Sequence, residues 1–327
     1  MKKRILSGMR PTGKLHLGHL VGALENWVKL QDDYECFFMV ADWHALMSEY
    51  ENTAGLPDNI IDNVVDWLAA GVSPEKSVLF VQSQVPAHLE LFMIASCVTP
   101  LGWLERCPTY KEQLREVTTR DLNTYGFLGY PVLQAADILV YKADKVPVGE
   151  DQLPHLELTR EICRKLNLLS KEQILPEPQA LLTENPRLLG LDGRKMSKSY
   201  NNTINLSDSP EEITKKIAGM FTDPKRIKLS DAGHPDTCNV YSYYATFIPG
   251  MKQEVFEWCT NAALGCTECK KRLSKSLVEK LEPFYERRLN FLKNKALVSD
   301  ILENGRKRAG TVASQTINEI KKAMNIS

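Results

Sequence analysis

Short apolar runs alternate with segments of helical periodicity through the first two hundred residues of the chain. Four runs have the length and composition of buried β-strands; they are residues 4–8 (RILSG), 36–41 (CFFMVA), 78–82 (VLFVQ) and 145–149 (KVPVG). Apolar side chains at helical spacing lie between or after them; these are Ile60, Ile61, Val64, Val65 and Leu68, closed by Gly71, and Leu153, Leu156, Ile162, Cys163 and Leu166. Alternating strands and helices predict an α/β fold with a parallel sheet, in which ligands bind beyond the carboxyl ends of the strands.

The pattern changes near residue 205, after which no run of strand type occurs. Residues 209–212 (SPEE) form a capping box with proline at the first helical position, so a helix should begin there. Helical periodicity continues at residues 255–264, 270–291 and 317–324. We therefore expect two domains, an α/β domain at residues 1–205 and an all-helical domain at residues 206–327.

Charge is balanced over the whole chain but uneven along it. The 327 residues include 41 Lys or Arg and 41 Asp or Glu, whereas residues 270–327 carry 14 basic against 6 acidic side chains. A basic segment is typical of a surface that binds a polyanion, although a solvated helix surface has the same composition. No stretch is apolar enough for a signal peptide or a membrane span, so we expect a cytoplasmic protein without membrane contact. The eight cysteines are then expected as thiols or metal ligands.

The segment PTGKLHLGHLVGAL, residues 11–24, places two histidines where an apolar helix should begin. The apolar positions predict a helix that starts near Lys14, with His16 and His19 on its first turn and Gly18 removing the side chain between them. Free backbone N–H groups and the helix dipole favour an anion there, and the imidazoles add donors. A phosphate chain fits this arrangement, although paired histidines also occur as surface or capping groups.

The segment GLDGRKMSKSYNN, residues 190–202, is a glycine-flanked loop that carries Arg194, Lys195 and Lys198 within five residues. Such a loop can close over a polyphosphate and stabilise charge that appears only in a transition state. By itself, a basic loop is usually just solvated.

Together, HxGH at the first strand–helix turn and KMSKS near the end of the α/β region resemble the two signatures of class I aminoacyl-tRNA synthetases. Four segments resemble the bacterial-type tryptophanyl-tRNA synthetases in particular; they are SGMRPTGKLHLGHLVGAL, FVQSQVP, FLGYPVLQAADILVYKADKVPVGEDQLPHLELTREI and LDGRKMSKSYNNTI. The resemblance implies a Rossmann-like catalytic domain at residues 1–205, including the KMSKS loop, and a helical anticodon-binding domain at residues 206–327. It also implies ATP-dependent attachment of tryptophan to its tRNA by a homodimer.

Three alternatives stay open at this point. Tyrosyl-tRNA synthetases share both signatures, but they favour Gly-Gly-Ser-Asp-Gln where this chain has VGEDQ. A nucleotidylyltransferase with an HxGH motif would lack KMSKS in this context. A non-catalytic tRNA-binding paralogue would be expected to have lost His16, His19, Lys195 or Lys198, and all four are present.

The resemblance assigns roles to individual residues. In the tryptophan site, Asp137 should accept the indole N–H, Tyr130 and Gln152 should hold the α-amino group, and His44, Gln134, Val146 and Val148 should line the indole pocket. A buried carboxylate without a donor is costly, so phenylalanine should be rejected. The predicted ATP contacts are Arg10, Pro11, Thr12, Gly18, His19, Gly149, Glu150, Asp151, Leu188, Lys195, Met196, Ser197, Lys198 and Ser199. In catalysis, His16 and His19 should steady the phosphates, while Lys195 and Lys198, with Mg²⁺, should neutralise the leaving pyrophosphate.

Three of these positions depart from the family pattern. His19 stands where many members have Asn, Arg10 where others have Gln, and Gln134 where an apolar residue is common. Arg10 could add a charge contact to ATP or to the substrate carboxylate, and the detail of the indole pocket stays open at Gln134.

Four cysteines fall close together near the C-terminal region, as Cys238, Cys259, Cys266 and Cys269. Four soft ligands suit a tetrahedral Zn²⁺ or a [4Fe–4S] cluster, and spacing alone does not choose between them. Some tryptophanyl-tRNA synthetases resemble this region and carry a [4Fe–4S] cluster near the anticodon-binding face, although their first cysteine interval is slightly longer. We therefore expect a [4Fe–4S] cluster, with zinc or free thiols as the alternatives and Cys238 as the least secure ligand.

Overall fold

The computed structural model describes residues 2–116, 121–182 and 188–326. The chain forms two compact units, each built from more than one segment. Unit 1 consists of Met1–Gly13, Trp27–Glu184 and Asn294–Ser327, and unit 2 of Lys14–Asn26 and Asn185–Lys293. Among the described residues, no helix combines the length and the hydropathy that a membrane span requires.

Unit 1 is built on a five-stranded sheet with the strand order β3-β2-β1-β4-β5, in which every neighbouring pair is parallel. The strands are β1 (Arg4–Met9), β2 (Glu35–Val40), β3 (Ser77–Val81), β4 (Lys145–Val148) and β5 (Gln179–Leu182). The four predicted strands and the predicted α/β class are confirmed. β5 was not predicted, because its apolar run is only three residues long and none of its four residues is fully buried.

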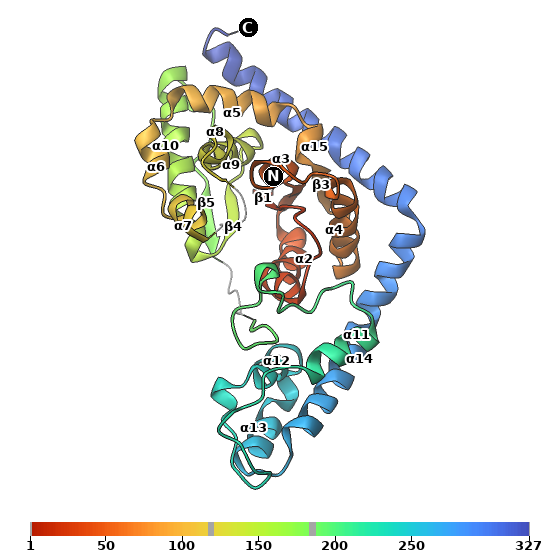
Figure 1. The fold of residues 1–327 in the computed structure, drawn as a ribbon. Coiled ribbons are helices and arrows are strands. Elements are labelled where there is room, and N and C mark those ends of the chain that lie inside the picture. The colour runs from red at the N-terminus through yellow and green to blue at the C-terminus, as the bar shows by residue number, and fades with distance from the viewer. Residues whose placement is uncertain (1, 117–120, 183–187, 327) are drawn as a thin grey trace. The chain divides into compact units, whose positions relative to one another are not determined.

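Helices surround this sheet (Figure 1). They are α2 (Glu25–Asp33), α3 (Asp42–Glu49), α4 (Leu56–Ala70), α5 (Ala87–Val98), α6 (Leu101–Glu105), α7 (Pro108–Glu116), α8 (Tyr125–Leu128), α9 (Tyr130–Val140), α10 (Leu153–Ser170) and α15 (Lys295–Ala323). The predicted helices correspond to α4 and α10, and Gly71 ends α4 in the left-handed conformation at φ 107°, as expected. Side chains of the strands, α5, α9, α10 and α15 form one continuous apolar core.

Helix α15 covers the outer edge of the sheet. β3 pairs only with β2 among the described strands, and α15 packs along its other side. The helix approaches so closely at Gly305 that a Cβ there would overlap the carbonyl oxygen of Leu79 and stand 2.6 Å from its carbonyl carbon. Nearby, Arg308 Nη1 donates to the carbonyl oxygens of Pro74 (3.0 Å) and Ser77 (3.2 Å). The exposed strand edge is thereby protected from pairing with other chains.

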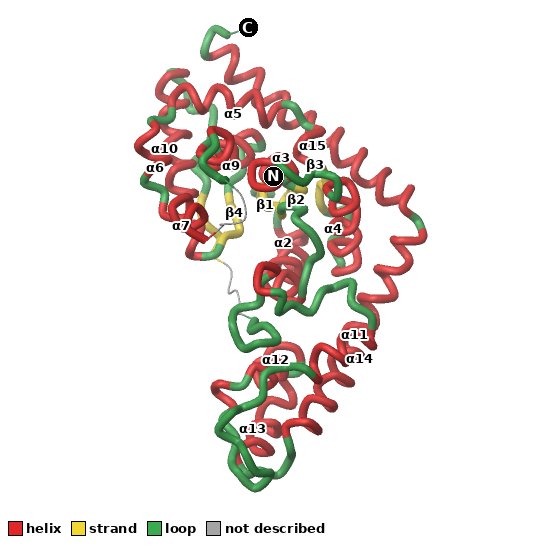
Figure 2. Tube along the Cα trace, viewed as in Figure 1, coloured by secondary structure: helices red, strands yellow, loops and turns green. Residues whose placement is uncertain are grey.

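Unit 2 consists of helices and connecting loops in the part that is described (Figure 2). Its helices are α1 (Leu17–His19), a π-helical segment (Leu20–Leu24) that continues into α2, α11 (Pro210–Ala218), α12 (Asn239–Phe247), α13 (Lys252–Thr260) and α14 (Cys266–Lys293). The predicted capping box is confirmed, since Ser209 Oγ accepts from Glu212 N and the Glu212 carboxylate accepts from Ser209 N. A helical region beyond residue 205 is likewise confirmed.

The contacts divide the chain differently from the predicted domains 1–205 and 206–327. Residues 294–327 belong with the sheet, because α15 packs on β3 and α5. Residues 14–26 belong with the later part of the chain, because Leu17 N donates to Ile204 O and Leu206 N donates to Leu15 O. The catalytic and anticodon-binding roles of the two predicted domains remain a prediction.

Candidate active site

The HxGH segment begins its helix three residues later than predicted, because an imidazole caps it. His16 is the N-cap of α1 and has extended backbone angles, so it does not lie on the first turn. Its Nδ1 accepts a hydrogen bond from Gly18 N (3.1 Å), and His19 Nδ1 accepts one from His16 N (3.1 Å). The first bond replaces the one that an N-cap Ser, Thr, Asp or Asn usually makes, and the second replaces the one that Glu or Gln makes in a capping box. Since Nδ1 is the acceptor in both neutral rings, Nε2 carries the proton and is a donor.

Both imidazoles are held in the neutral form. Burial, and then the charge of Lys198, lower the pKa of His16 to about 4. Burial also lowers the pKa of His19 well below its ordinary value, with further contributions from His16 and Lys198. The two ring centroids are only 3.8 Å apart, where two positive charges would repel each other. At neutral pH the motif therefore presents N–H donors rather than cations.

Gly18 is required by the close approach of the capping ring. A Cβ at this position would stand 2.9 Å from Cε1 and Nδ1 of His16, closer than two such atoms approach in proteins. The predicted role of Gly18, to leave room between the two histidines, agrees with this geometry.

Unit 2 brings the HxGH segment and the KMSKS loop together. Residues 203–206 follow the loop directly, and His16 forms an isolated antiparallel bridge with Asn205. Two backbone hydrogen bonds flank the bridge, from Leu17 N to Ile204 O (3.0 Å) and from Leu206 N to Leu15 O (2.9 Å). Two motifs far apart in the sequence thus become neighbours.

Asn202 fixes the shape of the KMSKS loop, a role that the sequence did not indicate. Its buried side chain accepts from Ser197 N (2.8 Å) and donates to Asp192 Oδ1 (2.8 Å) and to Lys195 O (3.1 Å). The loop backbone is anchored by these bonds; Met196 is buried, Lys195 is exposed, and Lys198 is half-buried with its charge acting on the His16 and His19 rings. The Ser199 side chain lies outside the described part of the structure.

Arg194 does not act as a third outward-facing cation of the loop. Its guanidinium forms an ion pair with Asp192 (2.6 Å) and lies 4.4 Å from the centre of the Tyr200 ring. These contacts engage it within the loop itself.

The other predicted ATP contacts fall in both units. In unit 1, exposed Arg10 donates to Ser48 Oγ (3.5 Å), and Pro11 and Thr12 line a cavity of about 220 Å³ with Glu49, Asn52 and Asn59. The segment Gly149-Glu150-Asp151 follows β4 and enters a short 3₁₀ turn. In unit 2, buried Leu188 accepts at its carbonyl from Met196 N (3.0 Å).

Asp137 lies at the centre of a buried polar network in unit 1. Its Oδ1 accepts from Gln82 Nε2 (2.7 Å) and from His88 Nδ1 (2.7 Å), and its Oδ2 accepts from His44 Nε2 (2.8 Å). The carboxylate is therefore not an unsatisfied acceptor, in contrast to the sequence argument for tryptophan selectivity. An ionised carboxylate offers about four acceptor positions, so one remains on the Oδ2 side, beside His44.

The network keeps Asp137 ionised. Burial by itself would raise the pKa of the carboxyl group, but hydrogen bonds from His44 and His88 outweigh that effect and hold the pKa below its ordinary value. Burial, followed by the Asp137 charge, raises the pKa of Tyr141 well above its ordinary value, so the Tyr141 hydroxyl keeps its proton. It then donates to His88 Nε2 (2.8 Å), which fixes the tautomer of that ring.

Tyr130 and Gln152 are joined by His155, which the sequence did not single out. Tyr130 Oη lies 2.9 Å from His155 Nε2, and His155 Nδ1 lies 3.1 Å from Gln152 Oε1. Because an amide oxygen only accepts, His155 donates from Nδ1 and its Nε2 accepts from the tyrosine hydroxyl. The oxygens of both Tyr130 and Gln152 are thus oriented by one buried imidazole.

The remaining predicted tryptophan-site residues are placed only by their elements. Val146 and Val148 are buried on β4, two residues apart and so on one side of the strand. Gln134 is half-buried on α9 between Tyr130 and Asp137.

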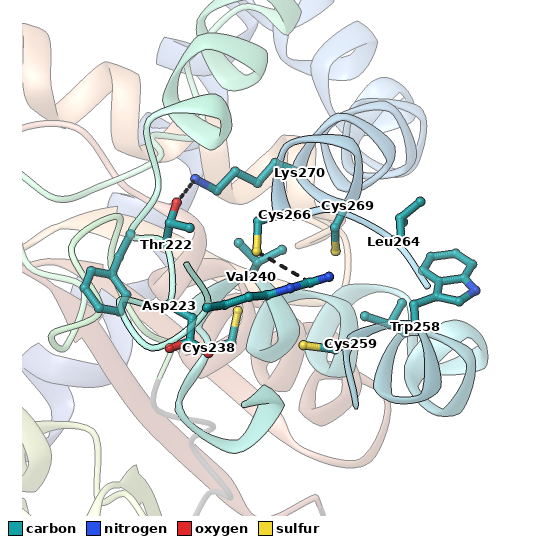
Figure 3. Close-up of a pocket in the computed structure, with 13 residues that line it drawn as sticks. Thr222, Asp223, Cys238, Val240, Trp258, Cys259, Leu264, Cys266, Cys269 and Lys270 are labelled. Atoms are coloured by element: carbon teal, nitrogen blue, oxygen red, sulfur yellow. Dashed lines mark hydrogen bonds between the residues drawn. The ribbon is translucent and has the colours of Figure 1, made fainter. Parts of the chain in front are cut away.

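The four C-terminal cysteines line one cavity in unit 2, and their sulfur atoms face one another across it (Figure 3). Burial, and then the neighbouring thiols, raise the pKa of Cys269 to about 12, and burial also raises the pKa of Cys238 and of Cys259. Arg226 Nη1 donates to Cys266 Sγ (3.8 Å). Among the described residues, no group of three His, Cys, Asp or Glu side chains is arranged to hold a metal ion, so the side-chain arrangement by itself supports neither zinc nor the expected [4Fe–4S] cluster.

The fold and the two adjoining motifs are those of a class I aminoacyl-tRNA synthetase, and residues 1–282 match the family model for class I tRNA synthetases (W and Y). The chain belongs to this family. It is 52% identical to the tryptophan–tRNA ligase of Thermotoga maritima over 99% of both chains. It is 44% identical to the tryptophan–tRNA ligase of Aquifex aeolicus over 99% of this chain and 100% of that one. The tryptophanyl-tRNA synthetase of Campylobacter jejuni, solved with ADP and tryptophan, superposes with a TM-score of 0.89 at 31% identity, over 98% of this chain and 99% of that chain.

Proposed function

We propose that this protein is a tryptophan–tRNA ligase, which joins L-tryptophan to its tRNA through a tryptophanyl-adenylate intermediate. The observation that carries the proposal is the junction of the HxGH segment and the KMSKS loop through residues 203–206. The relatives at 52% and 44% identity carry this name. No observation favours tyrosine as the substrate.

In the first step, the tryptophan carboxylate attacks the α-phosphorus of ATP and pyrophosphate leaves. The neutral imidazoles of His16 and His19 donate from Nε2 to phosphate oxygens, and Lys195 and Lys198 stabilise the negative charge that grows on the leaving group. Mg²⁺ bound together with ATP would supply further positive charge for the leaving pyrophosphate. No side-chain nucleophile is required, so the enzyme acts by positioning and electrostatics.

For the amino acid, we propose that the indole N–H donates to the remaining acceptor position on Asp137 Oδ2. Gln82, His88 and His44 fix the carboxylate in place, so it need not reorganise when tryptophan binds. The walls of the indole pocket are assigned to His44, Gln134, Val146 and Val148. A side chain without an N–H in that position leaves an acceptor unpaired, which supports rejection of phenylalanine.

The α-ammonium group is assigned to the oxygens of Tyr130 and Gln152. An ammonium group has only donors, and one buried imidazole orients both of these oxygens through hydrogen bonds. For ATP, Gly149, Glu150 and Asp151 are assigned to the ribose and the backbone of Leu188 to adenine. The remaining nucleotide contacts are assigned to Arg10, Pro11, Thr12, Gly18, Met196, Ser197 and Ser199.

In the second step, the 2′-hydroxyl of the terminal tRNA adenosine attacks the adenylate carbonyl and AMP leaves. The basic helices α14 and α15 are proposed to contact tRNA phosphates, while unstacked anticodon bases are read by the helical region at residues 206–327. We expect the enzyme to act in the cytoplasm.

We propose a homodimer that uses the outer face of α5. This helix buries Leu91 and Ala95 in the core but also exposes Leu89 (37%) and Met93 (62%) on its opposite side, and Leu101 of the following helix α6 is exposed as well. A twofold interface would cover these apolar side chains. The mass of the purified protein by light scattering checks this assignment.

We propose that Cys238, Cys259, Cys266 and Cys269 hold a [4Fe–4S] cluster. Four thiols on one cavity supply the donor set, and Arg226 supplies a positive charge next to it. The raised pKa values mean that cluster binding must displace protons from the thiols. Protein purified without oxygen is expected to contain about four irons and matching acid-labile sulfide per chain. Zinc, or no metal, would contradict the proposal.

Lys198→Ala is expected to slow tryptophan-dependent pyrophosphate exchange about 100-fold, because the transition state loses a positive charge on the leaving group. Tryptophan affinity, measured separately by calorimetry, should stay unchanged. Lys228→Ala removes an exposed lysine of the same unit and is the matched control. An unchanged exchange rate in Lys198→Ala would remove the loop from the mechanism. Wild-type exchange with tyrosine but not tryptophan, or with neither, would contradict the proposed function.

A further inference from the structure

The base of the KMSKS loop is held by a buried side chain that the mechanism above does not use. Asn239, the first residue of α12, has no exposed surface, and its Nδ2 donates to the carbonyl oxygens of Gly190 and Leu191 at 3.0 Å each. On its other side Gly190 faces Asn202, since a Cβ on Gly190 would overlap the Asn202 side-chain amide. The point from which the loop departs is therefore clamped between two asparagines.

A second hydrogen bond from the same region holds Leu191. Its carbonyl also accepts from Phe221 N (2.8 Å). The segment around Phe221 is fixed in turn by Lys270, whose buried ammonium donates to Met220 O (2.6 Å) and to Thr222 Oγ1 (2.8 Å). A buried lysine with carbonyl and hydroxyl partners makes a strong and directional anchor.

Asn239 and Lys270, from which these two connections to Leu191 start, each lie next to a cysteine of the cavity. Asn239 directly follows Cys238, and Lys270 directly follows Cys269. The cavity is lined by both cysteines and also by Phe221, Thr222 and Lys270, which Figure 3 shows around it in part. The groups that hold Leu191 are thus one residue along the chain from two of the cysteines that line the cavity.

We propose that Asn239 is a positioning residue for adenylate formation and that it couples the cysteine cavity to the KMSKS loop. Asn239 fixes the position of the loop base through the Gly190 and Leu191 carbonyls, and the loop base in turn positions Lys195 and Lys198. The packing of the cysteine cavity determines where Asn239, and with it the loop base, lies. The inference rests on the proposed function, because it assumes that the loop acts on pyrophosphate.

The test replaces Asn239 with leucine, which has a similar size and no donor. In Asn239→Leu, kcat for tryptophan-dependent pyrophosphate exchange should fall between about 10-fold and 100-fold, as for other small misplacements of catalytic groups. Tryptophan affinity should stay unchanged, and so should single-turnover transfer from preformed adenylate to tRNA, because pyrophosphate has already left. Asn239→Ser, which is smaller and leaves the packing of α12 less disturbed, should act in the same direction and serves if the leucine variant does not fold.

Thr246→Val is the matched control. It removes one hydroxyl hydrogen bond, to Ser242 O, from the same helix. The pyrophosphate-exchange rate of Thr246→Val should equal that of the wild type. This should hold even if Thr246→Val and Asn239→Leu have the same lowered melting temperature. Equal exchange rates in Thr246→Val and Asn239→Leu would overturn the positioning role. So would an Asn239→Leu variant that loses pyrophosphate exchange, tryptophan affinity and transfer to tRNA to the same extent.

Lys270→Met tests the link to the cavity. The double variant Lys270→Met/Asn239→Leu should lose less exchange activity than the product of the fold-losses of the two single variants. The reason is that both substitutions act on the Leu191 carbonyl. A fold-loss in the double variant equal to the product of the two single fold-losses would overturn the proposed coupling between the cysteine cavity and the loop. Normal exchange in the wild type with normal exchange in Asn239→Leu contradicts this inference alone, whereas absent exchange in the wild type contradicts the proposed function.

Discussion

Asp137→Asn is expected to lower kcat/KM for tryptophan in pyrophosphate exchange about 1,000-fold. An asparagine offers a single acceptor oxygen where Gln82, His88 and His44 all donate, and its amide would place a donor against one of them. The indole N–H would then lose its acceptor as well. Calorimetry with tryptophan should show the loss in affinity directly.

The loss should not depend on pH in the range of ordinary assays. The pKa of Asp137 lies below its ordinary value of 3.8, so the stability that the carboxylate contributes is present above that value and is lost as the pH falls through the lowered pKa. The control is Asp32→Asn, which removes the same charge from a surface ion pair with Lys76. Activity in Asp32→Asn should match the wild type. A Asp137→Asn enzyme with wild-type KM for tryptophan would refute the role of this residue.

Gly305→Ala is expected to destabilise unit 1 by about 3 kcal/mol or more. The added Cβ would overlap the Leu79 carbonyl, which belongs to the rigid backbone of β3, so α15 has to move away from the sheet edge. Arg308 would then lose its bonds to Pro74 and Ser77. Urea unfolding followed by circular dichroism measures the change.

Gly310→Ala provides the comparison within the same helix. A Cβ there meets nothing within 4 Å, so alanine should stabilise the helix by about 0.5–1 kcal/mol through its better helix propensity. The two substitutions are chemically identical and differ only in what the new methyl group meets. Equal unfolding midpoints for the two variants would show that α15 does not rest on β3 as described.

Much of the sheet could be predicted from the sequence, because buried parallel strands are continuous apolar runs and β2 and β3 have that form. β5 could not, because four residues of mixed burial carry no such signal. The length of α15 was also missed. Gly305 and Gly310 interrupt the helical pattern, and only the contact with Leu79 explains why a glycine stands at 305.

Within the site, residues in local motifs could be found and their partners could not. His16 and His19 stand out in the sequence, yet histidine is not a usual N-cap, so nothing there indicated that the rings cap the helix themselves. Gln82 and His88 reach Asp137 from about fifty residues away, and only the folded chain brings them there. Asn239 is similar, since its two carbonyl partners lie in a different segment of the chain.

The cover that α15 places on β3 also has a consequence for biosynthesis. The ribosome completes β3 long before it makes residues 295–323, so the nascent sheet has an open edge while most of unit 1 has already emerged. During that interval, the unpaired N–H and C=O groups of β3 are available to other nascent chains. The edge of β3 is therefore protected only after α15, which is translated late, has been made. Chaperone binding is most useful to the chain before that point.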